Sequence, residues 1–147
     1  MIAALLSGLL LMSMSGPEPN RAEKAGGLRC DIQVIHATRG KPFVDEALRP
    51  LRRYLKNSFG SRYQRFKQLE KRSLTLSQRE RGSLELPNGT KLLLTYLGVE
   101  ESLLRLVMEV GGLKTTVKVH DGGLFFQAGR KHKGGMLIVA IRAHAID

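Results

Sequence analysis

The sequence predicts an α+β fold in which a mainly antiparallel β-meander is covered by one amphipathic, basic helix and by a short second helix or turn. Apolar and polar residues alternate from residue 74 onward, which is typical of strands with one buried face. Turn-forming residues divide this region into about six to eight short strands, which indicates a sandwich-like or barrel-like arrangement. The third observation is a helical spacing of apolar residues over residues 44–59.

The N-terminal segment is predicted to be a leader that precedes a single folded domain. Its apolar run ends in the small residues Ser13 and Ser15 before Gly16, which is typical of a signal peptide, although no Lys or Arg opens the run. The run is shorter than the roughly 20 residues that span a bilayer, so we expect no transmembrane span in the mature chain. The predicted parts are a signal peptide (1–15), a flexible linker (16–28) and a single β-rich domain (29–147) with a helical segment (44–71).

The leader predicts a periplasmic or secreted protein. In the alternative, the apolar run is a buried N-terminal helix of a cytoplasmic chain, but Pro17 and Pro19 interrupt such a helix. The only cysteine, Cys30, cannot form an internal disulfide. We expect it to be a buried, unreactive thiol at the start of a strand, and a mixed disulfide with a partner is the alternative.

The first predicted strand is Asp31–Ala37, and the first helix follows it at residues 44–59. The strand is rich in β-branched residues. Pro50 lacks the backbone donor of a helix interior, so we expect either a kink or a regular helix that begins near Leu48. The apolar face of this helix consists of Val44, Leu48, Leu51, Leu55 and Phe59.

Residues 61–69 predict a short second helix or turn. Ser61 and Gln64 have the spacing of a helix capping box. The large apolar side chains of the segment are Tyr63, Phe66 and Leu69. They recur every three residues, and we expect them to anchor the segment to the core, in preference to stacking on nucleic-acid bases.

The remainder of the chain reads as a succession of strands and tight turns. Asn88-Gly89 is the strongest hairpin signal, and a type I′ turn is expected there. The unbroken apolar run Met136–Ile141 indicates a central strand covered on both faces. The other predicted strands lie near residues 74–76, 83–86, 91–97, 104–110, 113–119 and 124–128.

Positive charge is concentrated in one stretch of the chain. The formal net charge is +11, and residues 39–81 contain 13 Lys or Arg against 4 acidic residues. Such a surface attracts phosphates, anionic polymers, acidic proteins or anionic lipid head groups. The candidate binding residues on the exposed side of the helical segment are Arg49, Arg52, Arg53, Lys56, Arg62, Arg65 and Lys67.

A second basic feature is the predicted loop Gly129–Gly135. Its glycines allow backbone amides to approach an anion, and its cations are Arg130, Lys131 and Lys133. The P-loop pattern is not completed, because Gly135 and Met136 stand where Lys and Ser or Thr are required. The same composition suits an exposed hairpin tip, so a binding function requires that the loop lie beside the Arg52–Lys67 surface.

The sequence offers no catalytic or metal-binding motif. The four histidines are scattered, and His120 next to Asp121 is expected to be a solvated turn residue. A single cysteine cannot build a zinc site of the CxxC type. We therefore expect no catalytic residue, no metal ligand and no cofactor.

These features favour a non-catalytic, exported binding or assembly module that docks an acidic protein partner or an anionic envelope polymer through its basic helical face. A small nucleic-acid-binding domain, whose affinity would fall steeply with salt, is the alternative. A second alternative is an enzyme that uses the basic loop as an anion clamp. The identity of the partner and the oligomeric state are left open.

Overall fold

The computed structural model describes residues 26–146, which contain nine strands, one 3-10 helix and one α-helix. In chain order the elements are β1 (Gly27–Thr38), β2 (Phe43–Val44), η1 (Glu46–Leu51), α3 (Arg52–Phe59), β3 (Arg65–Leu76), β4 (Arg81–Glu85), β5 (Lys91–Glu100), β6 (Leu103–Val110), β7 (Leu113–Val119), β8 (Gly123–His132) and β9 (Gly135–Ile146). The predicted signal peptide and most of the predicted linker lie outside the described residues. The domain itself begins earlier than residue 29, because β1 starts at Gly27.

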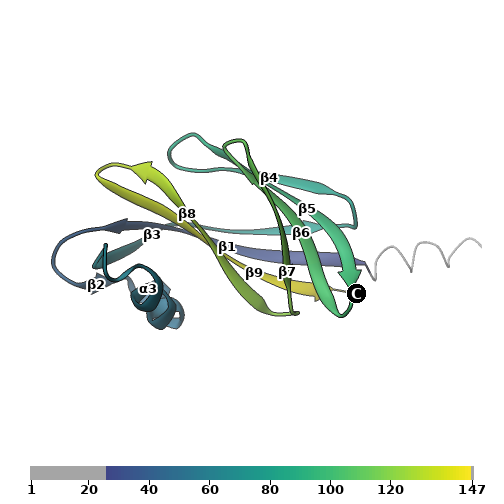
Figure 1. Ribbon diagram of the computed structural model, residues 1–147, viewed down its shortest axis with the longest axis horizontal. Coiled ribbons are helices and arrows are strands. Elements are labelled where there is room, and N and C mark those ends of the chain that lie inside the picture. Colours follow the sequence, from purple (N-terminus) through teal and green to yellow (C-terminus); the bar gives the residue numbers. More distant parts are fainter. Residues whose placement is uncertain (1–25, 147) are drawn as a thin grey trace, which may run out of the picture.

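Two sheets pack face to face, and the helical segment covers the outer face of one of them (Figure 1). The five-stranded sheet has the order β2-β3-β1-β9-β8, and the four-stranded sheet has the order β4-β5-β6-β7. The predicted β-rich α+β class is confirmed. The predicted succession of hairpins describes the four-stranded sheet, whereas the five-stranded sheet pairs the first strand with the last.

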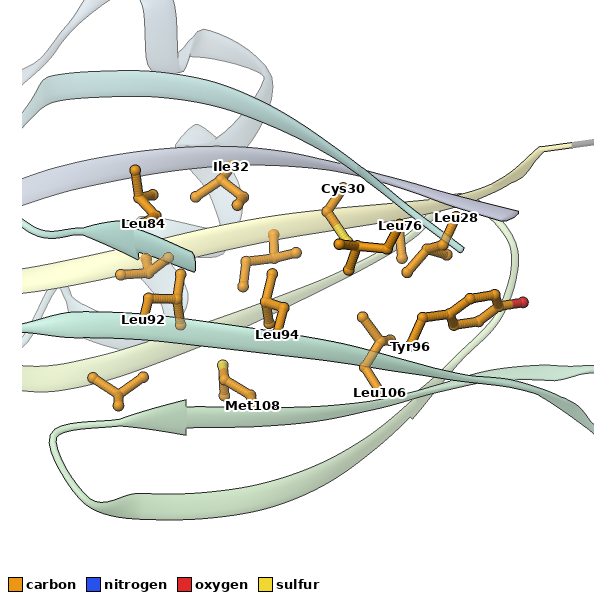
Figure 2. Packing of buried hydrophobic residues seen from close by; sticks show 14 of the residues in the cluster. Leu28, Cys30, Ile32, Leu76, Leu84, Leu92, Leu94, Tyr96, Leu106 and Met108 are labelled. Carbon is orange, nitrogen blue, oxygen red and sulfur yellow. The ribbon is translucent and has the colours of Figure 1, made fainter. Parts of the chain in front are cut away.

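The main core lies between the two sheets, where strands from both contribute alternate residues. Figure 2 shows leucines from β5 and β6 that face Cys30 and Ile32 of β1 across this layer. Tyr96 closes one side of the labelled cluster and is 1% exposed. The alternation of buried and exposed residues along β5 and β6 follows directly from the period of two in the sequence.

Cys30 is a buried member of this core, as the sequence predicts. Its side chain is fully covered, and burial together with the neighbouring Asp31 carboxylate raises the pKa of the thiol to about 12. A thiol reacts as its thiolate, and the Cys30 thiol is neither accessible to reagents nor ionised at neutral pH.

We therefore expect Cys30 in the folded protein to resist labelling by iodoacetamide at pH 8, whereas the guanidinium-denatured chain takes up one equivalent. Mass spectrometry of both samples after equal times measures the difference. Rapid labelling of the native protein would contradict the burial of β1 and would restore the mixed-disulfide interpretation.

The predicted helix is present but is divided in two at Pro50. The 3-10 helix η1 holds the proline, and the α-helix α3 begins two residues after it, where backbone donors are again available. Leu48, Leu51 and Leu55 of the predicted apolar face are buried against the five-stranded sheet, and Phe59 is partly buried there. Val44 belongs instead to the short strand β2.

Of the predicted second helix or turn at residues 61–69, the structure has a turn, which is followed by β3. The part of the segment that suggested a helix is a strand with a β-bulge. Ile35 is paired with Gln68 and Val34 with Glu70, so Leu69 is the extra residue of the bulge. Phe66 is buried beneath the helical layer, whereas Leu69 is 39% exposed.

The hairpin at Asn88-Gly89 is confirmed, but its turn differs from the predicted type I′. The amide of Gly89 donates to the carbonyl of Leu86 at 2.8 Å, so the turn spans residues 86–89 with Pro87 at its second position. Gly89 has a φ of 86°, and Asn88 does not have a positive φ. Proline at the second position and glycine at the fourth favour a type I turn, which explains the difference.

The predicted basic loop is also shorter than expected, because β8 continues to His132 and β9 begins at Gly135. Only Lys133 and Gly134 form the turn, with φ values of 38° and 77°. The basic residues therefore lie at the end of a regular hairpin. Among the described residues, no helix is long and apolar enough to cross a membrane.

Candidate functional site

A strongly cationic hollow lies at the tip of the β8–β9 hairpin, and we call it the tip pocket. It has a volume of about 410 Å³ and is lined by Arg39, Tyr63, Lys131, His132, Lys133, Gly134 and Gly135. Arg39 comes from the loop after β1, and Tyr63 from the turn before β3. Three segments that are distant in the sequence thus meet at the end of the domain that also carries α3 (Figure 1).

The pairing of β1 with β9 brings the hairpin tip to the loop after β1. Ala37 is paired with Met136, so the residues that follow β1 and those that precede β9 are neighbours. The Nε2 atom of His36 lies 2.8 Å from the carbonyl oxygen of His132, and a carbonyl only accepts, so this nitrogen is the donor. This hydrogen bond fixes the tip against β1.

Charge in the tip pocket is of one sign. Arg39, Lys131 and Lys133 line it without any acidic residue, and within residues 26–146 none of the three forms an ion pair. The pKa of His132 is lowered by partial burial, by His36 and by Lys133. The surroundings therefore disfavour a further positive charge and favour an anion.

A second hollow, which we call the helix groove, lies between β2 and the helical segment. Its volume is about 280 Å³, and its lining residues are Pro42, Phe43, Val44, Asp45, Glu46, Arg49, Arg52, Lys56 and Gln64. Here the charges are mixed. Arg49 is paired with Glu46 at 3.2 Å, and the carboxylate of Asp45 accepts from the amide of Gln68 at 3.1 Å. Arg52 and Lys56 are the groove cations without an ion pair among the described residues.

A third hollow joins the helix groove to the tip pocket. It measures about 270 Å³ and is lined by Pro42, Lys56, Gly60, Tyr63, Gln64 and Phe66. It shares Lys56 with the helix groove and Tyr63 with the tip pocket. The three hollows are therefore neighbours, and we call them together the cationic strip, around the helical end of the domain.

The structure places the predicted binding residues in different surroundings. Arg49, Arg52 and Lys56 line the helix groove, and Lys131 and Lys133 line the tip pocket. Those outside the three hollows are Arg53 and Arg62, which are exposed, together with Arg65, Lys67 and Arg130.

Two of the predicted arginines make internal contacts. One nitrogen of the Arg130 guanidinium donates to the carbonyls of Val110 and Gly111, at 2.8 and 3.1 Å, and so ties β8 to the β6–β7 turn. Arg65 donates to the carbonyl of Lys41 at 2.9 Å, and its guanidinium lies 5.3 Å from the centre of the Phe43 ring. Both side chains support the site from outside the hollows.

Sequence reasoning missed Arg39, His36 and the site role of Tyr63. Arg39 follows a predicted strand in a turn-like sequence, and nothing local indicates that it meets Lys131 and Lys133. The usable signal was the apolar run Met136–Ile141, because a central strand has neighbours on both sides and must bring the preceding basic turn to the end of another strand.

One other cluster of polar side chains surrounds Asp31 and does not have the geometry of a nucleophile with its base. Asp31 accepts from the hydroxyl of Ser73 at 3.1 Å, and His144 lies 3.3 Å from its other oxygen. The serine donates to the carboxylate and not to the histidine, so this is not a nucleophile with its base. Within residues 26–146, no three His, Cys, Asp or Glu side chains are grouped to hold a metal ion.

Comparison with known proteins gives no assignment for this fold or for this site. No protein-family model, curated protein or solved structure matches the chain. Inference about function therefore starts from the geometry and charge of the cationic strip.

Proposed function

We propose that the protein is a non-catalytic, exported binding or assembly module, which docks an acidic protein partner or an anionic envelope polymer through the cationic strip. The observation that carries the proposal is that the three hollows are neighbours, since they share Lys56 and Tyr63 in their linings. A ligand that follows this strip meets Arg52 and Lys56 at one end and the tip-pocket cations at the other. An extended polyanion fits such a path better than a small molecule does.

The distribution of charge supports binding in preference to catalysis. The tip pocket offers cations without a carboxylate, and the helix groove contains acids that are already engaged by Arg49 and by backbone amides. General acid–base chemistry would need a titratable group aimed at a substrate. Oriented cations on an open surface instead steer an anionic partner and hold it by charge-assisted hydrogen bonds.

Export is part of this proposal and rests on the leader-like sequence of residues 1–15. Acidic proteins and anionic polymers are present in the cell envelope and outside the cell, whereas most nucleic acid is inside the cell. Mass spectrometry of the protein from its native source checks this part, with a mature start at Gly16 as the expected result. An intact, cytoplasmic N-terminus would favour the nucleic-acid alternative.

Reversing three charges on α3 is expected to abolish polyanion binding while the fold is retained. In the triple variant Arg52→Glu, Arg53→Glu and Lys56→Glu, all three side chains are exposed, so the melting temperature should change little. Affinity for poly-glutamate should fall by about a hundredfold or more, because like charges placed against each other cost several kcal/mol. Fluorescence anisotropy at two salt concentrations measures the loss.

The matched control is Arg81→Glu, Lys91→Glu and Lys114→Glu, which makes the same change in net charge on the four-stranded sheet. We expect this control to keep most of the affinity. Equal losses in both variants would mean that net charge alone drives binding, and undiminished binding in the α3 variant would refute the role of the strip. Tighter binding to duplex DNA than to poly-glutamate would select the nucleic-acid function.

A further inference from the structure

We infer that the tip pocket is a binding site for a dianionic phosphate group of the phosphomonoester type. The inference rests on the proposed function and deepens it, because it names the chemical group that the cationic strip recognises at one end. The strip as a whole requires only negative charge. The tip pocket has a more specific architecture.

The first argument is the number of positive charges that need a partner. Arg39, Lys131 and Lys133 surround one hollow, no acid lines it, and none of the three is ion-paired within the described part of the chain. A carboxylate brings one negative charge and two oxygens. A phosphomonoester brings nearly two charges at neutral pH and three terminal oxygens, so it can engage all three cations at once.

The second argument is the backbone of the turn. Gly134 has no side chain, and a Cβ there would meet nothing within 4 Å, so an oxygen can approach the chain closely next to Lys133. The turn also holds Lys133 at a φ of 38°, a conformation that Asn or Gly adopts more readily. A lysine is therefore held at the rim of the hollow at a conformational cost to the turn.

The third argument is preorganisation. The His36 donor to the carbonyl of His132 anchors the hairpin tip, and the guanidinium of Arg130 anchors the same strand to the β6–β7 turn. Arg65 likewise holds the loop that carries Arg39, through the carbonyl of Lys41. These contacts hold the backbone that carries Arg39, Lys131 and Lys133, so less backbone freedom is lost when the pocket binds an anion.

The experiment titrates the full chain at pH 7.5 with phenyl phosphate and, as a matched monoanion, with benzoate. We expect phenyl phosphate to bind at least about tenfold more tightly, because its second charge and third oxygen find partners. The double variant Arg39→Gln and Lys133→Gln should lose about tenfold or more in this affinity. The control double variant Lys91→Gln and Lys114→Gln, which removes the same charge elsewhere, should not.

An NMR titration of the histidines adds a readout that a merely structural role would not move. Bound phosphate should raise the pKa of the His132 imidazole in the wild type and not in the tip variant. Equal affinity for benzoate and phenyl phosphate, or unchanged phosphate affinity in the tip variant, would overturn the inference. Vesicles of phosphatidylcholine with phosphatidate then separate a lipid source from a free or polymer-borne phosphate, since only a lipid-specific site requires the bilayer.

Failure of this inference is distinguishable from failure of the proposed function. Poly-glutamate binding that depends on Arg52 and Lys56, without selective binding of phenyl phosphate, would keep the docking function and reject the phosphate site. Selective phosphate binding without any polyanion binding would do the reverse. Loss of both would reject both proposals.

Discussion

Leu55→Ala is expected to lower the free energy of unfolding by about 2 to 5 kcal/mol, the range for removing a fully buried leucine from a core. Leu55 is completely covered in the layer between α3 and the five-stranded sheet, where it belongs to one cluster with Phe66 and Ile138. Alanine is the best helix former, so the helix itself is not weakened and the loss reports packing alone. Guanidinium denaturation followed by circular dichroism measures the change.

The control for this substitution is Leu113→Ala in β7. The chemistry of the change is identical, but Leu113 is 55% exposed, so we expect a change within about 0.5 kcal/mol. Similar midpoints for the wild type and Leu55→Ala would mean that the helical layer does not pack on the sheet. The helix groove would then have no fixed wall.

Gly135→Ala is expected to destabilise the protein by about 1 to 3 kcal/mol, the usual cost of forcing extra volume into a filled space. A Cβ atom at this position would overlap the carbonyl oxygen of Ala37 and would lie 2.7 Å from the Cγ2 atom of Thr38. It would also approach the Nε2 atom of His36 to 3.1 Å. The hairpin tip must therefore move away from β1, and the affinity for phenyl phosphate should fall together with the stability.

Gly134→Ala separates steric overlap from backbone strain. Its Cβ would have open space, but its φ of +77° is unfavourable for any residue with a side chain. We expect Gly134→Ala to lose stability and to keep the hydrogen bond from His36 to His132, which the NMR signals of His36 report. If Gly135→Ala leaves these signals and the affinity unchanged, the close packing of the tip on β1 is incorrect.

The strands and the helix face could be predicted because each depends on residues that are near in the sequence. Leu104, Leu106, Met108 and Val110 occupy alternate positions of β6, and all four are buried. Leu48, Leu51 and Leu55 follow the helical period and are buried on one face. Local periodicity decides which side of an element meets the core, whatever that core turns out to be.

The predictions that failed rested on local sequence patterns that more than one structure can produce. The three-residue spacing of Phe66 and Leu69 has the form of a helical turn, but both residues lie in β3, where Leu69 is the extra, exposed residue of a β-bulge. Leu113 continues the alternation of β7 and is nevertheless exposed, because the opposite sheet does not cover that end of the strand. The sequence pattern shows which face of a strand is apolar, but it does not show how far the opposite sheet extends over that face.

The candidate site was only half predictable for a different reason. Lys131 and Lys133 are recognisable as a basic turn, and Arg52 and Lys56 as a basic helix face. The pairing of β1 with β9, which are about a hundred residues apart in the chain, decides whether these two groups are neighbours. It also decides whether Arg39 lies beside them. Such long-range pairing leaves no short pattern in the sequence.

The same pairing of first and last strands decides how the domain is held. Gly27 lies opposite Ile146 at one end of the two strands, and Ala37 lies opposite Met136 at the other end, next to the tip pocket. Gly27 and Ile146 thus lie at one end of the domain, and α3 and the β8–β9 turn lie at the other end (Figure 1). A tether, tag or neighbouring module joined to the chain at either Gly27 or Ile146 would lie on the side of the domain opposite the tip pocket. The proposed phosphate site would then stay open to solvent.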